Sequence, residues 1–172
     1  LLDGAPLQQI ELVVTATTPA EKQKLLDDLK AHKAEGLVLK KKSAAYAPGR
    51  PASGGSQMKW KFIETCSIRV ATTHKTKRSV SLECLANDGT TPVALGNVTI
   101  PSNFDIPTPG AIVNVEYLYL YDGGSLFQPV YKGERTDQAQ PDQLHQFKLK
   151  STTAFVANAD TPAPTKRKAP KP

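Results

Sequence analysis

The 172-residue sequence contains no stretch that approaches the roughly 20 consecutive apolar residues of a membrane-spanning helix. Its first residues also lack the charged segment and following apolar segment that mark a secretory signal. We therefore predict a protein that is not integral to a membrane, with an intracellular location. The chain begins with Leu1 rather than methionine, which we interpret as the mark of a fragment of a longer protein.

Cysteine and aromatic residues are scarce. Only Cys66 and Cys84 are present, both in apolar-alternating runs, so we expect buried free thiols rather than a disulfide. The three histidines show no metal-ligand spacing with these cysteines. No Walker-type loop and no dinucleotide fingerprint occurs. Aromatic residues make up 6% of the chain, which does not favour a base-stacking platform.

Positive charge is in excess, but unevenly. The formal net charge is +6, and residues 161–172 contribute four basic residues and no acidic one. The rest of the chain therefore carries 18 basic and 16 acidic residues. Residues 151–172 are rich in threonine, alanine, proline and lysine, and we predict a disordered basic tail. Such a tail adds weak, salt-sensitive attraction to polyanions, or serves only to keep the protein soluble.

The first sixty residues read as an α/β segment. Alternating apolar residues predict a strand over residues 8–16. Thr18 is placed to cap a helix, Pro19 fits its first turn, and Glu21 completes a capping box. Leucines at 25, 26 and 29 share one face of this helix, which we expect to end near His32. Residues 37–39 predict a short buried strand, residues 41–58 a long loop, and residues 59–62 another strand.

From Ile63 onward, short alternating runs recur with turn signals between them, and no long helix is predicted. Five such strands predict a small barrel or sandwich, and an OB-like barrel suits that number best. The predicted strands cover residues 63–71, 79–86, 92–100, 111–120 and 126–132.

Glu35, Lys59 and Lys61 are the candidate site residues with the clearest chemistry. Strand residues at i and i+2 point to one face, so Lys59 and Lys61 project together, away from Trp60 and Phe62. Two ammonium groups on one face repel each other unless an anion lies between them, and a phosphate group is a suitable anion. A nearby carboxylate such as Glu35 is suited to hold a divalent metal that bridges to phosphate oxygens. The alternative is a solvated Lys-x-Lys strand beside a surface glutamate.

Three segments in order resemble motifs of the nucleotidyltransferases that include the ATP-dependent DNA ligases. Residues 35–40 (Glu-Gly-Leu-Val-Leu-Lys) are similar to motif IV, and residues 59–61 (Lys-Trp-Lys) to motif V. Between them, residues 46–50 (Tyr-Ala-Pro-Gly-Arg) resemble the Tyr-x-x-Gly-Arg loop of that family. The resemblance to the ligase catalytic core and OB domain spans about residues 8–138.

This resemblance implies a role for each matched residue. Glu35 would help to hold the catalytic Mg²⁺, and Lys59 and Lys61 would contact the α-phosphate of ATP or AMP. Their physical role would be to stabilise charge during in-line transfer at phosphorus. We place Lys40 and Arg50 among the residues that contact DNA, although Arg50 is equally suited to order the loop.

Residues 128–137 resemble motif VI, in which an Arg-x-Asp-Lys pattern is usual. Arg135 and Asp137 match, but Gln138 replaces the lysine, which puts the implied role in self-adenylation in doubt. An ordinary charged barrel loop is the alternative for these residues. The nucleophilic lysine of a Lys-x-Asp-Gly motif is absent, since Asp3-Gly4 has Leu1 at the lysine position. We therefore expect that these 172 residues do not adenylate themselves.

The resemblance implies an α+β fragment of a nucleotidyltransferase (ATP-grasp-like) domain over residues 1–62. An all-β OB-fold barrel would follow over residues 63–150, and then a disordered basic tail over residues 151–172. The implied function is the C-terminal part of an ATP-dependent DNA ligase. Its implied partners are nicked double-stranded DNA and the missing N-terminal half of the adenylation domain. Two alternatives remain: a non-catalytic OB-type nucleic-acid-binding protein that has lost its nucleophile, and an RNA ligase or capping-type enzyme.

Overall fold

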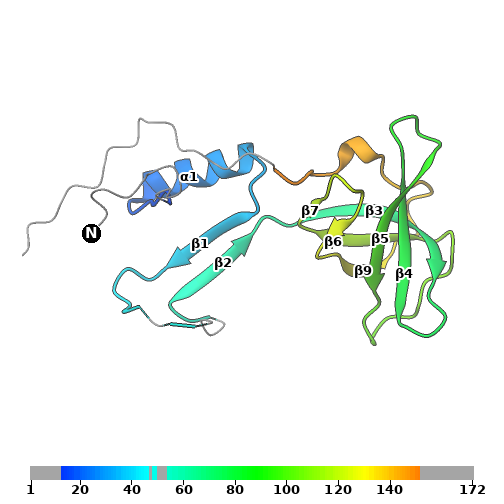
Figure 1. The fold of residues 1–172 in the computed structure, drawn as a ribbon, viewed down its shortest axis with the longest axis horizontal. Helices are drawn as coiled ribbons and strands as arrows, with labels where there is room; N and C mark the ends of the chain where they lie inside the picture. Colours follow the sequence, from blue (N-terminus) through cyan, green and yellow to red (C-terminus); the bar gives the residue numbers. More distant parts are fainter. Residues whose placement is uncertain (1–12, 47, 50–53, 152–172) are drawn as a thin grey trace, which may run out of the picture.

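A computed structural model describes residues 13–46, 48–49 and 54–151 of the chain. Within these residues the protein is mostly β, with one α-helix (Figure 1). This helix has 13 residues and is neither long nor apolar enough to cross a membrane, and the described residues contain no other candidate span. The elements are α1 (Pro19–Ala31), β1 (Gly36–Lys40), β2 (Gln57–Lys61), β3 (Glu64–Thr73), β4 (Ser79–Leu85), β5 (Pro92–Thr99), β6 (Ile112–Tyr117), β7 (Tyr119–Leu120), β8 (Leu126–Phe127), β9 (Val130–Glu134) and the 3-10 helix η2 (Leu144–Gln146).

The predicted start and end of helix α1 are confirmed. The Thr18 hydroxyl accepts a hydrogen bond from the Glu21 amide at 3.3 Å, and the Glu21 carboxylate accepts one from the Thr18 amide at 3.0 Å. Amides of Thr18 and Thr17 that donate to this carboxylate lower the pKa of Glu21 to about 2. The helix ends at its C-cap, His32. The strand predicted over residues 8–16 is wrong for residues 13–16, which form neither strand nor helix, and residues 8–12 lie outside the described residues.

Strands β1 and β2 form an antiparallel pair in which Gly36 lies opposite Lys61 and Val38 opposite Lys59. The prediction of two strands around a long loop is thus confirmed. The prediction that residues 37–39 are buried is wrong, because Val38 is 51% and Leu39 42% exposed. The physical reason is that a two-stranded sheet leaves surface open unless further layers cover it, and of the described elements only α1 lies alongside (Figure 1).

The larger sheet is antiparallel, with five strands in the order β5-β4-β3-β6-β9. Strand β3 pairs with both β4 and β6, which makes the connection from β5 to β6 cross the sheet. Strands β5 and β9 stand at opposite ends of this order and still contact each other, so the sheet curls toward closure. This arrangement is consistent with the predicted OB-like barrel. Its interior is filled by alternating strand residues, among them Ile68, Leu82, Leu95, Val113 and Val115.

The predicted strand over residues 111–120 is divided in the structure. Strand β6 ends at Tyr117, and the Leu118 amide donates to the Phe127 carbonyl at 3.1 Å. Residues 119–120 then pair with residues 126–127 as a separate two-stranded ladder. The two cysteines lie in the barrel core as free thiols, as predicted. Burial is the main cause that raises the pKa of Cys84 to about 11 and raises that of Cys66 further.

Candidate functional site

The β1–β2 hairpin carries one basic face. In antiparallel strands, residues directly opposite each other project to the same side, and the side alternates along the strand. The register therefore places Lys40, Lys59 and Lys61 on one face. Trp60 and Phe62 alternate to the other side, where their rings meet edge to face at 6.1 Å between centroids. The structure thus brings together the two lysines of the Lys-x-Lys segment and adds Lys40 to the same face.

Gly36 sets how closely the two strands approach at the barrel end of the hairpin. Its φ is 157°, and a Cβ at this position would overlap the Trp60 carbonyl oxygen and lie 2.9 Å from the Lys61 Cα. Only a residue without a side chain fits between these backbones. Beyond Gly36 the Glu35 carbonyl accepts a hydrogen bond from the Phe62 amide at 2.9 Å. The Glu-Gly pair of the first motif is therefore joined directly to the end of β2.

The Glu35 side chain acts on the junction between the hairpin and the barrel. Burial is the main cause that raises the pKa of Tyr119 to about 12, and the charge of Glu35 adds to that rise. The same charge opposes the burial that lowers the pKa of Lys148. Among the described residues, no ion pair joins Glu35 to Lys59 or Lys61. Glu35 is exposed and forms no ion pair with any described lysine or arginine, so on this part of the chain its carboxylate is available to a ligand that enters from solvent.

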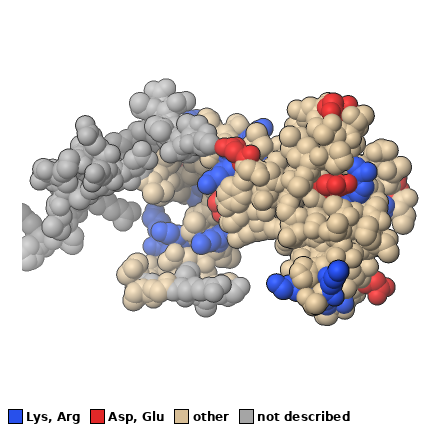
Figure 2. Space-filling view, turned by 45° about the vertical axis from the view of Figure 1, so that its right-hand side comes forward, with Lys and Arg blue, Asp and Glu red and all other residues tan. Residues whose placement is uncertain are grey.

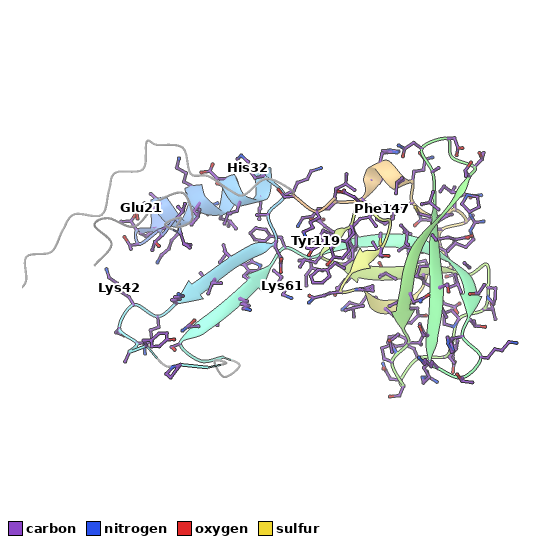
Figure 3. All side chains as sticks on the ribbon, in the orientation of Figure 1. Glu21, His32, Lys42, Lys61, Tyr119 and Phe147 are labelled. Carbon is purple, nitrogen blue, oxygen red and sulfur yellow. The ribbon has the colours of Figure 1, made fainter. Side chains whose placement is uncertain are left out.

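Lys61 reaches across the junction to the barrel. Its ammonium donates a hydrogen bond of 2.6 Å to the side-chain oxygen of Gln128, which lies between β8 and β9. Figure 3 shows Lys61 and Tyr119 on the two sides of this junction. Gln128 has a φ of 53°, a left-handed conformation that a non-glycine residue adopts only when its surroundings hold it there. The barrel thus presents a neutral acceptor to a predicted phosphate-binding lysine.

A magnesium ion held by protein groups alone does not fit the described residues. They contain no group of three histidine, cysteine, aspartate or glutamate side chains able to hold a metal. A single carboxylate does fit a different arrangement, in which Mg²⁺ is bound through one or two carboxylates together with substrate phosphates. Glu35 directly precedes β1, the strand that pairs with the strand of Lys59 and Lys61. It therefore fits a metal that arrives with a nucleotide, and Glu35 would be its protein ligand.

Arg135 and Asp137 form a forked ion pair at the end of β9. Two guanidinium nitrogens of Arg135 donate to the two carboxylate oxygens at 3.1 and 2.6 Å, and a third donates to the Ser67 hydroxyl at 3.0 Å. The hydrogen bond to Asp137 raises the pKa of Arg135, and the hydrogen bond from Arg135 lowers that of Asp137. Arg135 directly follows β9, whereas Gln128 lies before the first residue of that strand, so the length of β9 separates them. The structure does not bring the pair to Lys61.

The loop between β1 and β2 is described only in part. Lys40 is the last residue of β1, lies opposite Gln57, and is exposed. Tyr46 is 86% exposed. Arg50 and Ala47 lie outside the described residues, as does the predicted tail from residue 152 onward, so their assigned roles stay predictions.

Lys148 is a functional candidate that sequence reasoning missed. Its side chain is buried, and its ammonium donates to the carbonyls of Ala34 at 3.0 Å and Phe62 at 3.1 Å. Its amide donates to the Tyr117 hydroxyl at 3.0 Å. In the sequence it is one polar residue of an alternating run, with no signal that separates it from Lys150. The acceptors lie 114 and 86 residues away, and only the fold brings them to it.

Comparison with known proteins gives matches among solved structures alone. No family model matches the chain, and no curated protein matches it. A structure from a study of DNA binding with a minimal scaffold in Lig E DNA ligases is similar over 71% of this chain and 48% of that chain, with 21% identity and a TM-score of 0.47. The ligase domain of LigD from M. tuberculosis is similar over 67% and 49%, with 20% identity and a TM-score of 0.34.

The chain spans about half the length of each of these solved structures. The first structure comes from work on DNA ligases, and the second is a ligase domain.

Proposed function

We propose that the chain is the C-terminal part of an ATP-dependent DNA ligase, in which the β1–β2 hairpin forms one wall of the nucleotide site and the barrel helps to hold nicked DNA. The observation that carries the proposal is the hairpin register. It sets the Glu-Gly and Lys-x-Lys segments on adjacent strands, with Gly36 opposite Lys61 and Val38 opposite Lys59. Backbone pairing then sets the two ammonium groups on one face of a short sheet, and Glu35 directly precedes the first strand of that sheet.

The chemistry of the whole enzyme would proceed in three transfers. A lysine amine in the preceding part of the enzyme attacks the α-phosphorus of ATP, and pyrophosphate leaves. A 5′-phosphate oxygen of the nick then attacks the same phosphorus, and the lysine leaves. Finally the 3′-hydroxyl attacks the 5′-phosphorus, AMP leaves, and the strand is sealed. Each transfer places negative charge on phosphoryl oxygens.

In this proposal Lys59 and Lys61 supply the positive charge that the phosphoryl oxygens need. Fixed cations aimed at developing charge lower the barrier because they need no reorganisation during the reaction. Mg²⁺ bound with the nucleotide would neutralise further charge, with Glu35 as its protein ligand. Gln128 accepts the Lys61 hydrogen bond until phosphate takes its place.

The experiment uses the full-length protein encoded by the complete reading frame and a duplex with one labelled nick. Lys59→Ala and Lys61→Ala are each expected to lower the sealing rate about 10²-fold or more, the usual cost of removing one charge-stabilising group. Lys75→Ala and Lys77→Ala provide a matched control, because they form a second Lys-x-Lys pair on the turn between β3 and β4. A parent protein that binds DNA without sealing any nick would replace the proposal with a non-catalytic binding protein. Sealing of nicked RNA alone would favour an RNA ligase.

A further inference from the structure

A cavity of about 690 Å³ lies where the end of α1, strand β2 and the segment around η2 meet. Among the described residues that line it are four lysines (Lys30, Lys33, Lys61 and Lys148), His145, and one carboxylate, Glu64. Figure 2 shows that Lys and Arg side chains gather over the part of the molecule that contains the hairpin. We name this feature the junction cavity.

The positive charge of the junction cavity is not balanced within the described part of the chain. None of its four lysines forms an ion pair there with an aspartate or glutamate. Cations are favoured near the carboxyl end of a helix by the helix dipole, and this accounts for Lys30 and Lys33 at the end of α1. Lys61, Lys148 and His145 come from other elements and are not explained in this way. A concave surface lined by one sign of charge concentrates the opposite ion.

The shape of the cavity is held by Lys148. Its ammonium donates to the carbonyls of Ala34, which lies between α1 and β1, and of Phe62, which directly follows β2. The ammonium groups of Lys30 and Lys148 each lie 6.0 Å from the centroid of the Phe62 ring. Lys148 is therefore buried in the cavity with its ammonium already hydrogen-bonded. Lys30, Lys33 and His145 are exposed at the rim of the cavity. The rim side chains are the ones free to meet a ligand.

We propose that the junction cavity is a phosphate-binding subsite that takes a backbone phosphate of the DNA, with Lys30 and Lys33 as its contacting groups. The inference rests on the proposed function, which supplies DNA as the polyanion. A phosphodiester satisfies the rim cations without displacing Lys148 from its carbonyls. The phosphates of ATP offer the same chemistry, so the experiment separates the two sources.

The test measures binding of the full-length protein to a nicked duplex at several salt concentrations. The double variant Lys30→Gln with Lys33→Gln removes two charges and keeps side-chain length. Each phosphate contact contributes about 0.9 to the slope of log affinity against log salt, so the slope should fall by about one to two. One lost contact corresponds to roughly eightfold weaker binding at 0.1 M salt. The control double variant is Lys22→Gln with Lys75→Gln, which are exposed and do not line the cavity.

Unchanged slopes in the cavity variant would overturn the inference, as would a slope change equal to that of the control. A raised KM for ATP with an unchanged DNA slope would also overturn it, because the cavity would then serve the nucleotide. Melting temperatures equal to that of the parent would exclude a folding defect. The proposed function is tested separately, by nick sealing with the parent protein. If the parent seals no nick but the cavity variant still shows the reduced slope, the ligase assignment is wrong and the phosphate-binding subsite stands.

Discussion

The Lys61 ammonium donates a 2.6 Å hydrogen bond to the side-chain oxygen of Gln128, which lies 67 residues further along the chain. This bond joins the hairpin that carries the predicted phosphate-binding face to the barrel. A neutral amide holds the lysine in place without neutralising it. The acceptor can therefore yield to a phosphate oxygen, whose charge makes the stronger hydrogen bond.

Substitution at Gln128 should change nucleotide binding according to charge. Gln128→Glu would place a carboxylate against Lys61 and compete with phosphate, so we expect the KM for ATP in self-adenylation of the full-length protein to rise about tenfold, or ~1.4 kcal/mol. Gln128→Asn tolerates the left-handed backbone but is too short to reach, and should change the KM less than threefold. Equal KM values for Gln128→Glu and the parent would show that Lys61 does not contact the nucleotide.

Substitution at Gly36 should disrupt the hairpin. Gly36→Ala would press a Cβ against the Trp60 carbonyl and the Lys61 Cα, and backbone atoms cannot move aside without separating the strands. We expect faster hydrogen exchange of the Phe62 amide, which is bonded to the Glu35 carbonyl, and loss of nick sealing. Gly123→Ala is the control, since nothing lies within 4 Å of a Cβ there. Retained protection of Phe62 in Gly36→Ala would contradict the close approach.

Removal of the Lys148 ammonium should cost stability. Lys148→Met leaves the carbonyls of Ala34 and Phe62 without this donor, and we expect about 1–3 kcal/mol less free energy of unfolding in urea. Lys150→Met is the control, because its ammonium lies over the rings of Tyr119 and Tyr121, at 6.0 and 5.4 Å from their centroids. Its cost should stay within about 0.5 kcal/mol. Equal losses in the two variants would show that the Lys148 bonds do not stabilise the junction.

Alkaline pH should destabilise the protein partly through Tyr117. Burial is the main cause that raises the pKa of Tyr117 from 10.0 to about 12. Between these two values the unfolded chain releases the phenolic proton while the folded chain keeps it, so stability falls as pH rises through this window. Tyr117→Phe should lose less stability between pH 10 and 12 than the parent.

The Tyr117→Phe variant should also start from a lower stability at pH 8. The Lys148 amide loses its hydroxyl acceptor, at a cost of about 1 kcal/mol. Urea unfolding at a series of pH values measures both effects. The exposed Tyr46→Phe serves as control and should follow the parent throughout. Parallel curves for Tyr117→Phe and the parent above pH 10 would contradict the buried phenol.

Several features followed from local sequence patterns. The Thr18 and Glu21 capping box appears as predicted because its bonds join residues three positions apart. The first hairpin strand follows from a short apolar run, and the strands of the five-stranded sheet follow from apolar alternation interrupted by turn residues. The burial of residues 37–39 was predicted wrongly, because an apolar run shows which residues favour burial and not whether another layer covers them.

The sequence by itself determined the capped helix, the positions of most strands, and that Lys59 and Lys61 share a face, since these depend on neighbours a few residues apart. Only the tertiary structure decided that Lys61 meets Gln128 and that Lys148 ties the helix end to the strand end. It also left the Arg135 and Asp137 pair at the far end of β9. The contacts of Lys61 and Lys148 join residues 67 to 114 positions apart. Their partners depend on how the barrel closes and packs against the hairpin, and not on local sequence pattern.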